Sequence, residues 1–109
     1  MAEISDILTE LIDRTGRNKV NWQPTSDEQT FLASLGTASV MILEDQAGDA
    51  VLRILNLEGQ EIERLDSGIE GEGRTWRNEL RELYIMAKRV ALGVDSQLED
   101  LLQELRADS

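Results

Sequence analysis

Two short apolar runs in the middle of the chain, at residues 40–43 and 51–57, are the clearest structural signal in the sequence. An acidic segment with one glycine separates them at residues 44–49, and the chain resumes a partly apolar pattern at residues 60–65. Short runs rich in Val, Ile and Leu, punctuated by Gly and Asp, are typical of strands joined by hairpins. The pattern therefore predicts a three-stranded antiparallel meander.

The strands of this meander do not alternate strictly between apolar and polar residues. Successive side chains of a strand point to opposite faces, so Val40 and Ile42 share one face while Met41 and Leu43 share the other. A sheet with one face in water would show a clean alternation. We therefore expect both faces to be covered, either by helices of the same chain or by a second chain.

Helical spacing of apolar residues appears on both sides of the meander. Residues 3–15 carry one apolar stripe, made of Ile4, Ile7, Leu8, Leu11 and Ile12. A longer helix is predicted for residues 75–92, with an apolar face made of Trp76, Leu80, Leu83, Tyr84, Ala87 and Ala91. Gly16 and Gly93 are the expected C-terminal caps, because glycine readily adopts the left-handed conformation that ends a helix.

A last helix is predicted from a capping box at residues 96–99, with Asp95 as a competing cap, to about residue 107. The short connection at Gly93 indicates that the two C-terminal helices either fold back on each other as a hairpin or cross steeply. We expect core packing for its leucines, and a dimerisation or partner surface if the helix is not needed to cover the sheet. The leucines concerned are Leu98, Leu101 and Leu102, and Leu105 follows on the same predicted helix.

Two further segments precede the meander. Residues 19–22 alternate like a short strand, which Pro24 should end because proline has no amide hydrogen to donate. Residues 30–35 read as another strand, and a helical turn over residues 27–35 is the alternative. Two aromatic residues of these segments are expected to anchor the core: Trp22 and Phe31.

The segment at residues 66–73 holds three glycines and three carboxylates and predicts a mobile surface loop. It lacks the Gly-Lys-Ser/Thr ending of a phosphate-binding loop, and its acidic residues would repel phosphate. The acidic residues here and at residues 44–49 also lack the spacing of a calcium loop. We therefore expect no metal site and no cofactor.

Composition narrows the class of protein further. The chain has 109 residues with neither cysteine nor histidine. No Ser, Thr, Lys or carboxylate lies in a recognisable catalytic motif, so we expect a protein that is not an enzyme. The formal net charge of −11 favours solubility and opposes nucleic acid and anionic membranes. No signal pattern and no membrane-spanning run is present, so we expect one cytoplasmic domain over residues 1–109.

Basic residues gather on one stripe of the long predicted helix, which is a local reversal of the overall charge. The stripe includes Arg74, Arg77, Arg81 and Lys88, with Ile85 as an exposed apolar member. These side chains could pair with the chain's own acidic hairpins, since exposed ion pairs are common. The functional alternative is a docking surface for an acidic helix or tail of a partner.

These observations predict an α+β fold with an N-terminal helix, an antiparallel sheet of 4–5 strands around the meander, and a C-terminal helical hairpin packed on the sheet. For function they favour a protein–protein interaction module such as an adaptor, an immunity-type or antitoxin-type inhibitor, or an accessory domain. A self-assembling protein is the first alternative, and an acidic mimic of nucleic acid is the second. The expected partner-binding residues are Arg74, Arg77, Arg81, Ile85, Lys88, Leu98, Leu101 and Leu102.

Overall fold

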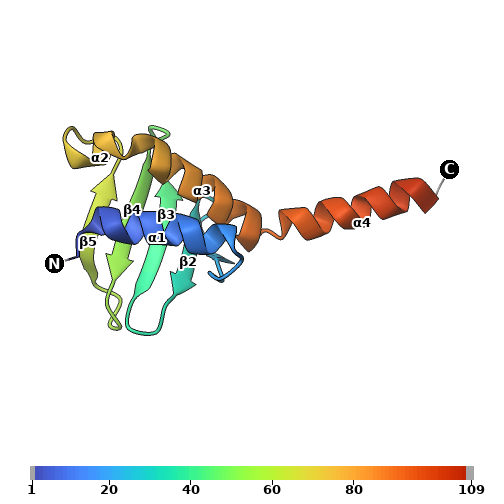
Figure 1. The fold of residues 1–109 in the computed structure, drawn as a ribbon, viewed down its shortest axis with the longest axis horizontal. Coiled ribbons are helices and arrows are strands. Elements are labelled where there is room, and N and C mark those ends of the chain that lie inside the picture. Colours follow the sequence, from blue (N-terminus) through green and yellow to red (C-terminus); the bar gives the residue numbers. More distant parts are fainter. Residues whose placement is uncertain (1, 108–109) are drawn as a thin grey trace.

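The computed structural model describes residues 2–107, and Figure 1 shows their helices and strands. In chain order these elements are α1 (Ile4–Gly16), β1 (Gln23–Pro24), β2 (Thr30–Ser34), β3 (Ser39–Glu44), β4 (Ala50–Leu55), β5 (Glu61–Asp66), α2 (Glu72–Thr75), α3 (Arg77–Ala91) and α4 (Val94–Ala107). The predicted α+β class is confirmed, with an N-terminal helix, a five-stranded antiparallel sheet and C-terminal helices. No described helix is both long enough and apolar enough to cross a bilayer.

The sheet is a simple meander in which each strand pairs antiparallel with the next, in the order β1-β2-β3-β4-β5. The central register sets Ile42 of β3 beside Leu52 of β4, and Leu52 beside Leu65 of β5. The predicted meander at residues 40–65 is therefore confirmed. Residues 30–34 form β2, so the helical turn considered for residues 27–35 is wrong.

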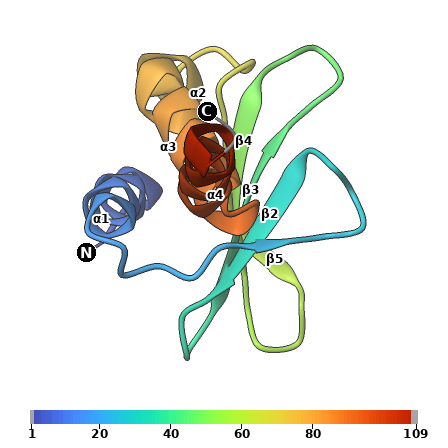
Figure 2. The same cartoon turned by 90° about the vertical axis from the view of Figure 1, so that its right-hand side faces the viewer.

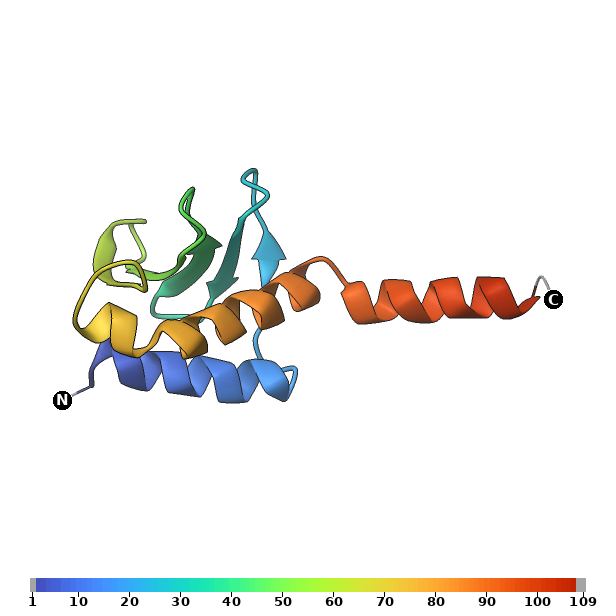
Figure 3. The same cartoon turned by 90° about the horizontal axis from the view of Figure 1, so that it is seen from above.

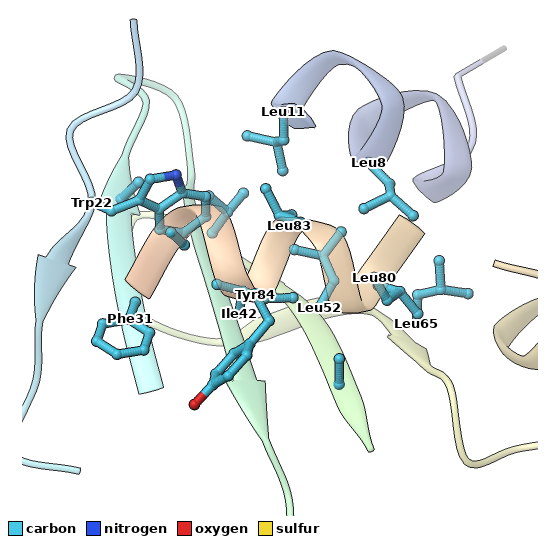
Figure 4. Packing of buried hydrophobic residues seen from close by; sticks show 14 of the residues in the cluster. Leu8, Leu11, Trp22, Phe31, Ile42, Leu52, Leu65, Leu80, Leu83 and Tyr84 are labelled. Carbon is cyan, nitrogen blue, oxygen red and sulfur yellow. The ribbon is translucent and has the colours of Figure 1, made fainter. Parts of the chain in front are cut away.

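One face of the sheet is covered by α1 and α3, which lie side by side across it (Figures 1 and 2). The apolar stripes predicted for both helices face inward. Leu8 and Leu11 of α1 and Leu80, Leu83 and Ala87 of α3 are buried in one cluster with the sheet residues Phe31, Ile42, Leu52 and Leu65 (Figure 4). The core is thus complete between these two helices and the sheet.

The opposite face of the sheet has no described helix over it (Figure 2). Val51 is buried there, while Met41 and Leu43 are half-buried. The side chain of Arg53 covers part of this face. Its Nε lies 2.6 Å from Glu61 Oε1, and its Nη1 lies 3.7 Å from Met41 Sδ. Cover by helices of the same chain is therefore confirmed for one face only.

Local details before the meander differ from the sequence predictions. Gly16 lies inside α1, and the left-handed residue that follows the helix is Asn18, with φ of +59°. Residues 19–22 are not a strand; the first strand is β1, and Pro24 is its last residue. Proline is tolerated there because β1 is an edge strand, where an amide hydrogen is not needed on the outer side.

The glycine-rich segment after β5 is more ordered than a loose surface loop, so that prediction is wrong for its second half. Residues 72–75 form α2, and Gly73 within it is buried. A Cβ atom at Gly73 would lie only 1.9 Å from the backbone oxygen of Asp66, so α2 packs directly on the backbone at the end of β5. Glycine serves here for close approach of two backbones, not for mobility.

Candidate functional site

The last helix, α4, projects from the rest of the molecule as an arm (Figures 1 and 3). None of its residues, Val94–Ala107, is buried. Its leucines are exposed over about half of their surface: Leu98 54%, Leu101 46%, Leu102 41% and Leu105 63%. We call these four residues the leucine face. The expectation that they belong to the core is wrong, and α3 alone of the two long C-terminal helices packs on the sheet.

The direction of α4 is set at its junction with α3. Gly93 adopts φ of +61° and donates its N–H to the carbonyl of Val90, while Leu92 donates to the carbonyl of Lys88. Gly93 was correctly predicted as the residue that ends the long helix. The new helix then starts at Val94, so the predicted capping box at residues 96–99 lies within the helix and is wrong as a start signal.

An ion pair bridges this junction. Arg89 of α3 and Asp95 of α4 approach to 2.5 Å between Nη2 and Oδ1, and the carbonyl of Gly93 accepts the N–H of Gln97. These contacts tie the first turn of α4 to the end of α3 with the arm pointing outward. A hairpin would require a different geometry at Gly93.

Exposed leucines are ordinary when they are scattered. Among residues 2–107, however, six of the ten large exposed apolar residues lie between positions 85 and 105: Ile85, Leu92 and the leucine face. An isolated helix shorter than about 12–15 residues is marginal in water, and most helices gain their stability by packing an apolar face. The arm has 14 residues and an apolar face with nothing described packed on it. This combination sets α4 apart from the helices that pack on the sheet.

The predicted basic stripe is divided between two helices, with Arg74 on α2 and Arg77, Arg81 and Lys88 on α3, and much of its charge is used within the chain. Arg81 donates to Glu44 Oε2 at 2.8 Å and to the carbonyl of Gly48 at 3.0 Å, both at the β3–β4 hairpin. Arg74 lies 3.9 Å from Glu70. Pairing with the chain's own acidic segments is therefore what the structure shows for these two arginines.

Among the described residues, two cations of the stripe lack the kind of ion pair that Arg81 and Arg74 form. Within residues 2–107, Arg77 and Lys88 form no ion pair shorter than 4.0 Å. Arg77 borders a hollow of about 480 Å³ between α3 and the β3–β4 hairpin, which it shares with Asn78 and Asp49. Lys88 lies near Ile85, which is 51% exposed. Partner binding by these residues stays a prediction.

The stripe and the leucine face do not form one continuous site. The stripe residues lie on α2 and α3 in the body, and the leucine face lies beyond Gly93 on α4 (Figure 3). Sequence reasoning missed Leu92 and Leu105 as candidate partner-binding residues. The signal that could have found Leu105 is the spacing of Val94, Leu98, Leu101 and Leu105, which follows a 4-3-4 pattern typical of coiled-coil seams.

Tyr84 is the one tyrosine of the chain and packs its ring against Phe31, with ring centroids 5.9 Å apart. Burial raises the pKa of the Tyr84 phenol above its ordinary value of 10.0, and the nearby Glu44 carboxylate raises it further, against a smaller opposing effect of Arg81. The folded protein therefore holds the phenol proton more tightly than the unfolded chain does.

This pKa shift predicts a loss of stability in alkali. The contribution of Tyr84 is fully present below pH 10.0 and disappears as the pH rises through the raised pKa of the folded state. Absorbance titration of the phenol should give a midpoint above 10.0, and Tyr84→Phe should lose less stability than the wild type between pH 9 and pH 11. A midpoint at or below the ordinary value would contradict the burial of this ring.

No group of three His, Cys, Asp or Glu side chains among the described residues is placed to hold a metal ion. Comparisons with protein-family models, curated proteins and solved structures found no match to this chain. The candidate site therefore depends on the geometry of the chain itself, and its most distinctive feature is the leucine face.

Proposed function

We propose that this protein is a non-catalytic protein–protein interaction module that docks an amphipathic partner on the leucine face of α4. The observation that carries the proposal is the contrast between the two parts of the chain. The body, residues 4–91, has a complete core, whereas α4 has four leucines on one face and no buried residue. A helix that adds nothing to its own core but keeps an apolar face is suited to binding another surface.

The charge of the arm describes the kind of surface it would fit. Asp95, Glu99, Asp100 and Glu104 give α4 an acidic polar side, with Arg106 as its one cation. An apolar surface that places no carboxylate opposite these acidic side chains would suit such a helix, because like charges at an interface cost affinity. We also propose that the protein acts in the cytoplasm, which its lack of cysteine fits.

Affinity capture of partner proteins from a cell lysate, with the wild type and matched charge variants as bait, tests this function. The double variant Leu98→Glu with Leu101→Glu should capture no more than about one tenth of the partner that the wild type captures, because it removes two central apolar contacts. Glutamate favours helices, so the arm itself should persist. The body should melt as in the wild type, since α4 has no buried residue.

The control is Leu57→Glu with Ile62→Glu, which adds the same charge at two apolar residues that are 76% and 59% exposed and lie away from α4. It should capture the partner as well as the wild type does. Equal loss in both double variants would indicate a general charge effect. Undiminished capture by the α4 variant would contradict the proposed function.

A further inference from the structure

We propose that a second copy of this chain occupies the leucine face, with the α4 helices of two copies paired antiparallel in a two-fold dimer. This inference rests on the proposed function, because it takes the leucine face to be a docking surface and names what docks there. It is supported by the spacing of the apolar residues, by the placement of the charges along α4 and by the size of the body.

The spacing of apolar residues along α4 suits a helical partner. Val94, Leu98, Leu101 and Leu105 follow one another at intervals of four, three and four residues, which is the a/d pattern of a coiled-coil seam. Leu102 lies beside this seam and widens it. A seam of this kind is best filled by a second helix with the same spacing.

The seam is self-complementary when two copies run antiparallel. Leu98 of each copy then lies opposite Leu101 of the other, and Val94 lies opposite Leu105. The two-fold axis generates four layers in this way, and every layer joins two apolar side chains. No polar residue falls in the seam.

The charges of α4 are placed so that a second copy is tolerated. In the antiparallel pair, Glu104 lies beside Gln97 of the second copy, and Asp95 lies beside Leu102 of the second copy. Glu99 and Asp100 fall on the side of the helix away from the seam. Two chains that each carry a net charge of −11 can therefore meet here without opposing carboxylates at the flanking positions.

The size of the body selects the antiparallel direction. Figure 2, which looks along the arm, shows α4 within the outline of the body, between α1 and the sheet. The two shorter dimensions of the molecule are 29 and 26 Å. Paired helices lie about 8–10 Å apart, so a parallel pair would force two bodies into the same space. An antiparallel pair places the bodies at opposite ends.

The interface is small, which fixes the expected strength of the dimer. A 14-residue helix is about 21 Å long. A single helix pair of that length buries less than the roughly 1,200–2,000 Å² of a stable interface. We therefore expect a reversible dimer that forms with a dissociation constant between about 10 μM and 1 mM.

Sedimentation equilibrium of the full chain tests for the dimer. The apparent mass should rise from 12.2 kDa toward twice that value as the concentration increases to about 1 mM. The Leu98→Glu/Leu101→Glu variant should stay at the monomer mass, while Leu57→Glu/Ile62→Glu should behave as the wild type. A wild type that stays monomeric throughout would overturn the inference, and so would a dimer that persists in the α4 variant.

Engineered cysteines test the direction of the pair, since the chain has none of its own. A mixture of Val94→Cys copies and Leu105→Cys copies should form the mixed disulfide. Either variant alone should cross-link poorly, because its cysteines would lie about 16 Å apart along the antiparallel pair. Efficient cross-linking of each variant with itself, and not of the mixture, would contradict the antiparallel arrangement.

These results also separate the inference from the proposed function. A chain that remains monomeric but loses a different captured protein on Leu98→Glu/Leu101→Glu would overturn the second copy as occupant and support the docking role of α4. A dimer that is insensitive to those substitutions, together with undiminished capture, would overturn both.

Discussion

Replacing Trp22 with alanine is expected to lower the free energy of unfolding by about 3–5 kcal/mol, the usual cost of truncating a large buried aromatic residue. Trp22 is 1% exposed and lies in the cluster that joins α1 to the sheet (Figure 4). Its Nε1 donates a hydrogen bond to Thr15 Oγ1 at 3.0 Å, and Thr15 is itself buried. The substitution therefore leaves a cavity and removes the partner of a buried hydroxyl group.

Urea unfolding, followed by far-ultraviolet circular dichroism, measures this effect. Small domains have a total stability of about 5–15 kcal/mol, so the variant should be close to its folding limit at 37 °C. Trp22→Phe should lose less, because it keeps most of the packing and gives up only the hydrogen bond and part of the volume. A loss below about 1 kcal/mol for Trp22→Ala would show that this side chain is not a core residue.

Replacing Gly73 with alanine is expected to destabilise the protein by at least about 2 kcal/mol, because overpacking against a rigid neighbour forces the backbone to move. The added methyl group would lie 1.9 Å from the carbonyl oxygen of Asp66 and 2.8 Å from its carbonyl carbon. Both are backbone atoms at the end of β5, so no side-chain rotation can relieve the clash. The short helix α2 must separate from the strand.

Gly16→Ala provides the matched control for this substitution. Gly16 lies in the last turn of α1, and the nearest atom to an added methyl group would be Met86 Cε at 3.5 Å, which is an ordinary contact. Alanine favours helices over glycine by up to about 1 kcal/mol, so this variant should be as stable as the wild type or slightly more stable. Equal urea midpoints for Gly73→Ala and Gly16→Ala would contradict the close approach of α2 to β5.

The parts of the fold that follow from local periodicity were predictable. The inward stripes of α1 and α3 repeat with helical spacing, and the meander strands are separated by Gly-containing turns. The first strand was placed too early, at residues 19–22, although Pro24 does end β1. A proline is tolerated within β1 because it is an edge strand, which is a property of the whole sheet. The role of Gly73 depends likewise on which backbone lies beside it.

The candidate site was predicted less well, and the reason lies in long-range contacts. Arg81 and its partner Glu44 are separated by 37 positions, so no local pattern reveals that this charge is already used. The leucine face was visible as a stripe, but a stripe alone does not distinguish a helix on its own core from a helix that projects. That distinction depends on the backbone conformation at Gly93.

The central claim is that the leucine face of α4 is where this protein meets another protein surface. Hydrogen–deuterium exchange tests it most directly, by comparing the dilute protein with its captured or self-associated complex. We predict fast exchange of the α4 amides in the dilute protein, because a lone helix with no buried residue opens readily, and clear protection of α4 in the complex. Protection confined to α3 or to the open sheet face, with α4 unchanged, would contradict the account.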